Sequence, residues 1–269
     1  MKRIFAAVLT AVLSIQALAG FAYDPSFWAA DAVNSAVRLS LISEEYSTKS
    51  FQDAISRGDF INVAVNLYAT ITAENVSTHA NNPFTDTSDP FPNMAYYAGL
   101  VSGDGEGHFY PQGTLTRQEL CKIMTSLLDS AGVLGPYFPS ENVFGDIVDS
   151  GDIASWAQNH VAFMLDNNLM AGDEDGRFRP NDAVTREEAA IIAYRCFIRY
   201  GRDWNGSIRT ALRRTKDAGG RTIQTLVKTI TLDSGATVAL RNADNPNAPD
   251  VAMSGVSGGS DGTAPSGTP

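Results

Sequence analysis

The sequence predicts an all-α protein built from three helix-loop-helix repeats. A helix-start pattern, an apolar stripe and a loop pattern recur along the chain, and together they indicate this fold class. The helix-start pattern is a hydroxyl residue, then an arginine, then a carboxylate three residues after the hydroxyl, which is typical of a capping box. The hydroxyl residues are Ser56, Thr116 and Thr185, and the carboxylates are Asp59, Glu119 and Glu188.

An apolar stripe follows each of these helix starts. Counted from the carboxylate, positions 1, 4, 5, 8 and 9 are apolar in all three copies, as in Leu120, Ile123 and Met124 of the second copy. This spacing places the apolar side chains on one face of a helix. Three helices with the same apolar face predict that all three pack into one centre.

A loop pattern precedes two of the helix starts. Residues 100–111 and 169–180 coincide without a gap at their Gly, Asp, Gly, Phe and Pro positions. The corresponding segment of the first repeat, residues 43–50, lacks both the glycines and the proline. The first repeat therefore departs from the other two at this loop.

The first helix of each repeat is less regular than the second. Trp28 and Trp156, each followed by alanine, open apolar helical stretches in the first and third repeats, whereas the second repeat has no tryptophan there. When Phe84-Thr85-Asp86 is aligned with Phe144-Gly145-Asp146, the second repeat is shorter between this motif and its helix start. We expect a trimmed first helix in the second repeat.

Composition changes divide the chain into six segments. A positive start, an apolar stretch and an A-x-A exit predict a cleaved secretory signal, and no other window approaches membrane-spanning length. Beyond the repeats lie a basic segment, expected to be irregular apart from a small hairpin of 229–232 with 237–240, and a polar tail expected to be disordered. The segments are 1–22 (signal), 23–80, 81–139 and 140–201 (repeats), 202–241 (basic segment) and 242–269 (tail).

Charge and cysteine content exclude several classes of function. Residues 23–200 carry 24 acidic and 10 basic side chains, and this excess argues against a nucleic-acid-binding protein. Cys121 and Cys196 stand in the helical repeats at positions where other copies place small apolar residues, so we expect two core thiols. The three histidines show no metal-ligand spacing, and we predict no metal and no cofactor.

The ordered motifs resemble the S-layer homology family. Phe-x-Asp, Trp-Ala, Gly-x-x-x-Gly-x-Phe-x-Pro and Thr-Arg-x-Glu follow one another in that order in the third repeat, and the likeness extends over residues 24–200. The resemblance implies three modules in a pseudo-threefold spindle, with the second helices at its centre and grooves between modules. It also implies an exported protein of the bacterial cell wall or surface layer, held noncovalently by secondary cell-wall polymer, often through a pyruvylated sugar, on peptidoglycan-linked glycan. Self-association in a surface layer is a further implication.

The arginine at each helix start is the predicted polymer ligand. A helix N-terminus favours an anion, and a guanidinium matches a carboxylate or phosphate. Arg186 is the first choice because its repeat is closest to the family pattern, followed by Arg117 and Arg57. The tryptophans can stack on sugar or pack in the core, and two loop glycines relieve strain or allow close approach. These additional candidates are Trp156, Trp28, Gly172 and Gly103, whereas the hydroxyl and carboxylate residues of the boxes are predicted to cap the helices.

Three other functions compete with polymer binding. Asp173-x-Asp175-Gly176 with Asp182 partly matches an EF-hand calcium loop, although its first position is alanine and its twelfth is aspartate. An enzyme is disfavoured because residues 202–269 contain no His, Cys or Glu, and the repeats offer no nucleophile with a base. A surface adaptor that recruits a partner through the basic segment is the remaining alternative.

Overall fold

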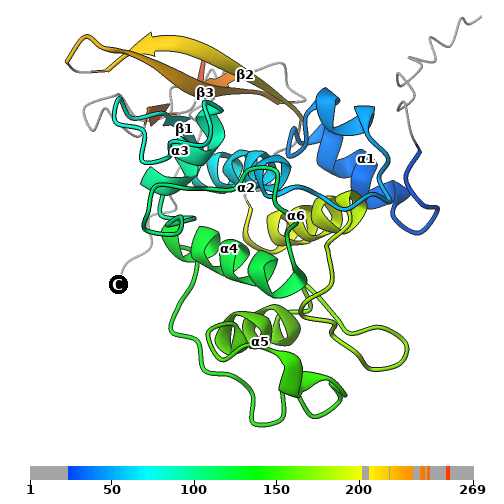
Figure 1. The fold of residues 1–269 in the computed structure, drawn as a ribbon. Helices are drawn as coiled ribbons and strands as arrows, with labels where there is room; N and C mark the ends of the chain where they lie inside the picture. The colour runs from blue at the N-terminus through cyan, green and yellow to red at the C-terminus, as the bar shows by residue number, and fades with distance from the viewer. Residues whose placement is uncertain are drawn as a thin grey trace, which may run out of the picture.

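Six α-helices and a small sheet make up the described part of the protein (Figure 1). The computed structural model describes residues 24–201, 206–217, 219–232, 237–239, 241–242 and 253–254. The predicted signal, 1–22, and most of the predicted tail lie outside these residues. The helices are α1 (Ala30–Arg38), α2 (Arg57–Thr72), α3 (Pro90–Tyr97), α4 (Arg117–Ser130), α5 (Gln158–Asp166) and α6 (Arg186–Tyr200), with short 3-10 helices at Glu44–Thr48 and Ser150–Asp152.

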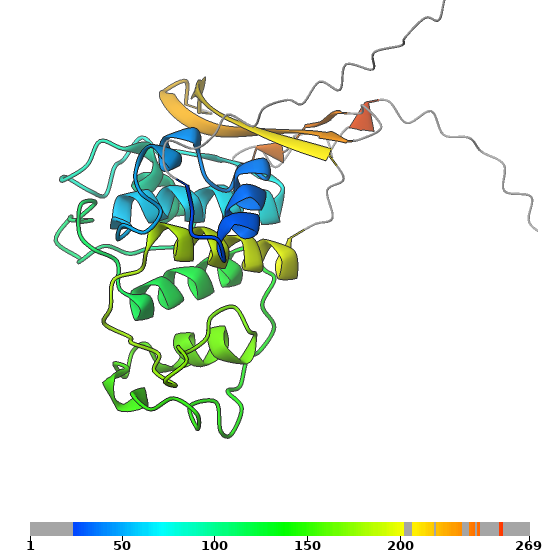
Figure 2. The same cartoon turned by 90° about the vertical axis from the view of Figure 1, so that its right-hand side faces the viewer.

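The helices that follow the capping pattern, α2, α4 and α6, lie in the interior of the helical body, where α2 contacts both of the others (Figures 1 and 2). Each outer helix packs on the inner helix of the preceding repeat: α3 on α2, α5 on α4, and α1 on α6. The last of these contacts joins the end of the helical body back to its beginning. The contacts between helices therefore form a cycle.

The first N–H groups of the inner helices join this cycle. Such groups have no partner within their own helix. Here each inner helix donates its first two N–H groups to carbonyls in the loop before the next inner helix, at N···O distances of 2.8 to 3.0 Å. The pairs are Arg57 to Gly113 and Gly58 to Pro111, Arg117 to Asp182 and Gln118 to Pro180, and Arg186 to Asp53 and Glu187 to Phe51. The cycle is thus held by backbone hydrogen bonds as well as by side-chain packing.

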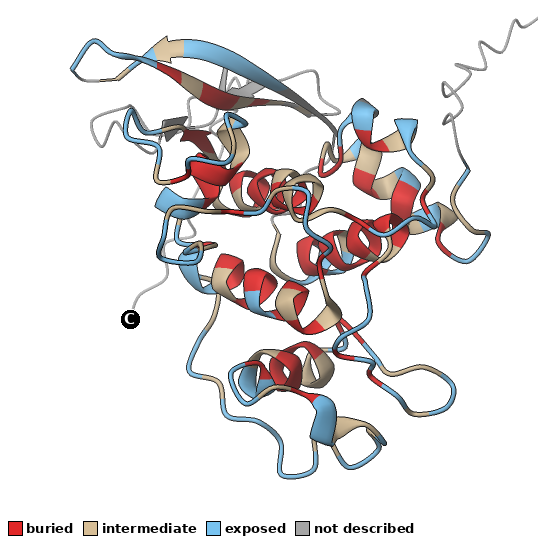
Figure 3. Ribbon diagram, in the orientation of Figure 1, coloured by how far each residue is buried: buried red, intermediate tan, exposed pale blue. Residues whose placement is uncertain are grey.

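The apolar stripes of the inner helices form the core. All the predicted stripe positions are buried except Tyr68, which is partly buried (Figure 3). Cys121 and Cys196 are buried free thiols in this core, as their sequence positions suggested. Burial raises the pKa of Cys121 to about 12, so this thiol behaves as a small apolar group.

A six-stranded sheet covers one end of the helical body, so the all-α expectation is incomplete. Its strands run in the order β5-β1-β3-β4-β6, with β2 also paired to β3; β1 and β5 are parallel and the other pairs antiparallel. The bounds are β1 (Glu74–Ser77), β2 (Gly206–Lys216), β3 (Thr222–Leu232), β4 (Thr237–Ala239), β5 (Arg241–Asn242) and β6 (Met253–Ser254). The protein is mostly helical with a C-terminal β-hairpin.

The basic segment is not irregular. The predicted pairing of 229–232 with 237–240 is present as β3 with β4, where Ile230 lies opposite Val238. The longer hairpin of β2 with β3 was missed because β2 is rich in arginine, which hides its alternation. Since a lone hairpin is marginal in water, the added strand β1, which directly follows α2, helps to explain why this hairpin is stable.

The first helix of the second repeat differs little in length from its counterparts. Helix α3 has 8 residues, and α1 and α5 have 9 each. The trimming therefore falls mainly on the segment before the helix. Among the described residues, no helix combines the length and the hydrophobicity that a membrane span requires.

Candidate functional site

The second and third helix starts are capped reciprocally. The Thr116 hydroxyl accepts from the Glu119 N–H, and the Glu119 carboxylate accepts from the Thr116 N–H at 2.9 Å. Thr185 and Glu188 repeat this arrangement, with the N–H to carboxylate distance at 2.8 Å. Such a box satisfies two donors that the helix itself leaves free.

The first helix start is capped from one side only. The Ser56 hydroxyl accepts from the Asp59 N–H at 3.1 Å. The Asp59 carboxylate instead accepts from Lys49 at 2.9 Å and from Arg186 at 2.6 Å. Aspartate is one methylene shorter than glutamate, and its carboxylate here faces the neighbouring repeat instead of its own N-cap. Asp59 therefore joins two repeats.

The arginine at the start of each inner helix contacts the next repeat in the cycle. The sequence did not reveal these contacts. Each guanidinium lies over an aromatic ring of the next repeat's loop, at 4.1 to 5.2 Å from the ring centroid. Each also faces the carboxylate at the third position of the next inner helix, at 2.6 to 3.9 Å. The sets are Arg57 with Phe109 and Glu119, Arg117 with Phe178 and Glu188, and Arg186 with Tyr46 and Asp59.

The arginines differ in how many of their donors are already used. Arg117 donates to the carbonyls of Phe178 and Ala171 and to the Glu188 carboxylate, so all three of its nitrogens are engaged. Arg186 is 2% exposed and donates to Asp59 and to the Tyr46 carbonyl.

Arg57 is the least engaged of the three arginines. Among the described residues its side chain donates no hydrogen bond, and Glu119 approaches its Nη1 only to 3.9 Å. The buried Nε atoms of Arg57 and Arg186 both lack a partner, but the Nη1 and Nη2 groups of Arg186 are engaged. Arg57 therefore retains the largest capacity to bind an added anion.

Each arginine lines its own cavity between repeats. The Arg57 cavity has a volume of about 290 Å³, the Arg117 cavity about 310 Å³ and the Arg186 cavity about 260 Å³. These volumes lie at or near the lower end of the range for small-ligand sites. The three predicted arginines are thus brought to three separate cavities and not to one site.

The Arg57 cavity contains three of the predicted polymer-binding residues. Arg57 comes from the first repeat, Gly103 from the second and Trp156 from the third, although they are remote in sequence. Trp156 is 48% exposed, and Lys122 Nζ lies 5.6 Å from the centroid of its ring. The cavity therefore offers two cations against the single carboxylate of Glu119, next to an accessible aromatic face.

Gly103 is required by the packing of its own loop. Its φ is +71°, a conformation that side-chain-bearing residues rarely adopt. A Cβ at this position would lie 2.7 Å from the Phe84 ring and 3.1 Å from the His108 carbonyl oxygen. The glycine therefore allows the loop that lines the cavity to pack against Phe84 without strain.

The other two cavities are more balanced in charge. The Arg117 cavity adds Gly172, Arg177 and Arg179, and three carboxylates oppose these cations. The Arg186 cavity is lined by Lys49 and Asp59, which lie next to the buried guanidinium. Trp28 is 64% exposed and is not among the lining residues of the three cavities.

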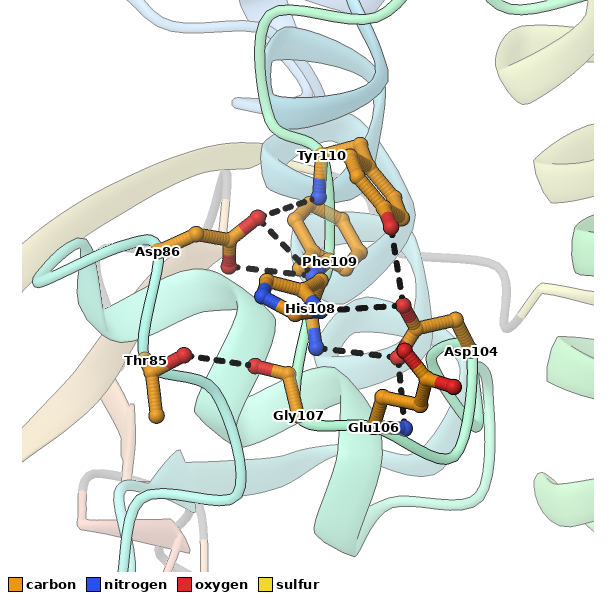
Figure 4. A network of polar contacts seen from close by, with 8 residues as sticks. All are labelled: Thr85, Asp86, Asp104, Glu106, Gly107, His108, Phe109 and Tyr110. Atoms are coloured by element: carbon orange, nitrogen blue, oxygen red, sulfur yellow. Dashed lines mark hydrogen bonds and ion pairs between the residues drawn. The ribbon is translucent and has the colours of Figure 1, made fainter.

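Asp86 and Asp149 each hold a glycine loop in place through hydrogen bonds from its backbone. The position of Asp149 shows that the alignment of Asp86 with Asp146 was wrong. Asp86 accepts from the N–H groups of Phe109 and Tyr110 at 2.7 to 3.1 Å (Figure 4). In the third repeat Asp149 makes the matching bonds to Phe178 and Arg179 at 2.7 Å. Asp149, and not Asp146, is therefore the counterpart of Asp86, because the third repeat carries an insertion that shifts the register by three residues.

Asp173, one of the carboxylates suggested as calcium ligands, is engaged within its loop. Asp173 accepts from the N–H groups of Asp175 and Arg177 and pairs with Arg179 at 2.6 Å. The N–H of Arg177, foremost among these partners, holds the pKa of Asp173 below its usual range. Asp173 thus has a structural role in shaping its loop.

The equivalent loop of the second repeat holds a cluster that the sequence did not reveal (Figure 4). Among the described residues, Asp104, Glu106 and His108 are the group of potential metal ligands whose atoms lie within 4.8 Å of one another. Asp104 already accepts from the N–H groups of Glu106 and His108 and from the Tyr110 hydroxyl. These bonds, that of His108 first, hold the pKa of Asp104 well below its usual range, so the cluster is accounted for as loop structure.

The fold and the site define a helical module whose repeats are joined by arginine contacts and separated by small cavities. The S-layer homology domain profile matches residues 93–121, which include Arg117, and residues 147–190, which include Arg186. These two segments are therefore similar to the S-layer homology domain.

Proteins similar in sequence to this chain include surface proteins and enzymes. The chain is 30% identical, over 50% of its length, to a cellulosome-anchoring protein of Acetivibrio thermocellus and covers 28% of that protein. It is 26% identical, over 69% of its length, to an S-layer protein of Bacillus licheniformis and covers 21% of it. It is 28% identical, over 65% of its length, to an amylopullulanase of Thermoanaerobacterium thermosulfurigenes and covers 10% of it. The chain spans less than a third of each of these relatives.

Proposed function

We propose that this chain is a non-catalytic anchoring module that binds an anionic secondary cell-wall polymer, with the Arg57 cavity as its principal site. The observation that carries the proposal is the state of Arg57, whose Nη groups donate no hydrogen bond among the described residues and which shares its cavity with the exposed Trp156. A guanidinium with a free edge suits a carboxylate, such as that of a pyruvylated sugar, or a phosphate.

The remaining residues of the Arg57 cavity suit a sugar. Trp156 offers a ring face on which a pyranose can stack, and Lys122 adds a second positive charge beside it. Gly103 allows the loop that forms one wall of the cavity to adopt its conformation. Together they provide the apolar face and the few fixed polar groups that are typical of small-ligand sites.

The proposal also includes a pseudo-threefold arrangement of three modules, with repeats at 23–80, 81–139 and 140–201. The cyclic packing of outer on inner helices supports it, as do the cyclic backbone hydrogen bonds of the helix starts. The cycle includes the first repeat, which carries Tyr46 in place of a loop phenylalanine and Asp59 in place of glutamate. On this view the Arg117 and Arg186 contacts mainly hold the ring of modules together.

Anchoring is favoured over catalysis by the matched segments themselves. The family similarity covers helices and loops that contain capping boxes, ring contacts and small cavities. Enzymes among the relatives are much longer than this chain, and it covers only 10% of the amylopullulanase. We therefore propose that the polymer holds this protein at the cell surface, where it can also self-associate.

Cosedimentation tests this proposal. The chain without its predicted signal is mixed with cell-wall sacculi, before and after extraction of the secondary polymer, together with Arg57→Ala and the control Arg38→Ala, an exposed arginine of α1. We expect binding that is lost on extraction and weakened about tenfold by Arg57→Ala, the loss of one charge-assisted contact. Equal binding to extracted sacculi, or an Arg57→Ala variant that binds like the control, would overturn it.

A further inference from the structure

The outer edge of β2 is an exposed strand edge. β2 pairs with β3 along its full 11 residues, and no other strand in the described part of the chain pairs with it. Residues 211–214 are all exposed, on both faces of the strand (Figure 3). An unpaired edge presents backbone N–H and C=O groups that can hydrogen-bond an added strand.

This edge is strongly basic. Residues 206–232 contain six basic side chains and one acidic side chain, in contrast to the acidic helical body. The acidic one, Asp217, pairs with Arg221 at the hairpin turn. Arg213 lies opposite Thr225 and Arg214 opposite Gln224, so the two arginines project from opposite faces. Neither forms an ion pair with a carboxylate of the described residues. Leu212 lies between Ala211 and Arg213 and is 41% exposed.

We propose that the outer edge of β2 binds an extended acidic peptide segment of a partner protein as an additional strand of the sheet. A polyanion lying along one face of the ribbon would meet only one of the two arginines. An added strand presents side chains on both faces, so that a carboxylate can lie beside each arginine. Leu212 supplies an apolar contact within the same edge.

A second copy of this strand is a poor occupant of the edge. In an antiparallel pair of two β2 strands centred on Arg213, the two copies of Arg213 would lie opposite each other. Like charges directly opposite each other are destabilising. A second copy would therefore add further positive charge to this edge, whereas an acidic partner would neutralise it.

The test uses the full chain without its predicted signal and a defined probe. The probe is a fluorescent ten-residue peptide of alternating valine and threonine with two consecutive glutamates at its centre, followed by anisotropy. We expect saturable binding that Arg213→Glu with Arg214→Glu weakens about tenfold or more. The matched control is Arg38→Glu with Arg199→Glu, two exposed arginines of the helical body, and it should change binding less than about twofold.

Further probes separate strand addition from simple charge attraction. A peptide of the same sequence, N-methylated at alternate residues, keeps its charge but loses backbone donors, and we expect it to bind at least about tenfold more weakly. The unmodified peptide should also slow hydrogen exchange of β2 amides. Equal affinity for the N-methylated peptide, for polyphosphate or for phosphatidylglycerol vesicles would overturn the proposal in favour of a general polyanion surface. Absence of peptide binding would overturn it in favour of an edge whose arginines only prevent aggregation.

Discussion

The guanidinium of Arg186 donates to the carboxylate of Asp59 at 2.6 Å, across the junction between the last and the first repeat. Arg186 is 2% exposed, and it also donates to the Tyr46 carbonyl at 2.7 Å while lying over the Tyr46 ring. This pair closes the cycle of contacts between repeats. Its main role in our account is therefore structural, although the sequence had made Arg186 the first candidate ligand.

Replacing Asp59 with asparagine should destabilise the protein. The neutral amide would leave a buried guanidinium without its counter-charge, and we expect a loss of about 2–4 kcal/mol in the free energy of unfolding, allowing for the partial exposure of Asp59. Chemical denaturation of Asp59→Asn and of Asp31→Asn, an exposed residue of α1, checks this value. Equal stability of the two variants would contradict a structural role for the pair.

Acid should weaken the same junction. Burial works to raise the pKa of Asp59, but the hydrogen bonds from Lys49 and Arg186 outweigh it and hold this pKa below its usual range. The stabilisation is therefore present above the unfolded-state pKa of about 3.9 and is lost as the pH falls through the folded-state value. We expect the free energy of unfolding of the wild type to fall below about pH 4 more steeply than that of Asp59→Asn. Parallel curves for the two proteins would contradict this assignment.

Lys228 should make the sheet more stable at high pH. Its side chain is 1% exposed, Nζ lies 3.3 Å from the Ser40 carbonyl oxygen, and burial lowers its pKa to about 7. The unfolded chain keeps the proton up to about pH 10.4, so burial of the charged amine costs stability below pH 7, and this cost declines as the pH rises. We expect Lys228→Met to stabilise the protein at pH 6 by on the order of 2 kcal/mol, with a smaller gain at pH 9. Chemical denaturation of the wild type and of Lys228→Met at the two pH values measures this gain in stability. A Lys228→Met variant that is less stable than the wild type at pH 6 would contradict the prediction.

Alanine substitutions at two glycines of one loop distinguish the stability cost of a steric clash from the cost of an unfavourable backbone conformation. Gly103 and Gly105 have φ values of +71° and +86°, but only at Gly103 would a Cβ meet other atoms, whereas at Gly105 nothing lies within 4 Å. We expect Gly105→Ala to cost about 1 kcal/mol through conformation alone and Gly103→Ala about 2–4 kcal/mol, because the Phe84 ring must also move. Thermal unfolding of both variants tests the difference, and equal melting temperatures would contradict the close approach.

Local structure was predictable from the sequence, and contacts between repeats were not. The Thr116 and Thr185 caps and the apolar stripes depend on residues three or four positions apart, which the sequence displays directly. By contrast, the contact of Arg57 with Phe109 depends on the order of repeats around the cycle. The identity of the loop-holding aspartate also escaped the alignment, since an insertion placed Asp149 where Asp146 was expected.

The sheet was missed for a different reason. β1 is a four-residue strand that directly follows α2, and it pairs with a strand about 150 residues later in the chain. Such pairing is nonlocal and leaves little trace in a short segment. In β2 the arginines obscure the alternation expected of a half-buried strand, because this edge strand is exposed on both faces at residues 211–214.

Calorimetric titration with the polymer released from sacculi tests the central claim most directly. Wild type, Arg57→Ala and Arg117→Ala are compared at one salt concentration, after circular dichroism has shown that each is folded. Our account predicts that Arg57→Ala weakens binding about tenfold or more and Arg117→Ala less than about threefold, because the donors of Arg117 are already engaged. Unchanged affinity in Arg57→Ala with a large loss in Arg117→Ala would contradict the assignment of the Arg57 cavity as the principal site.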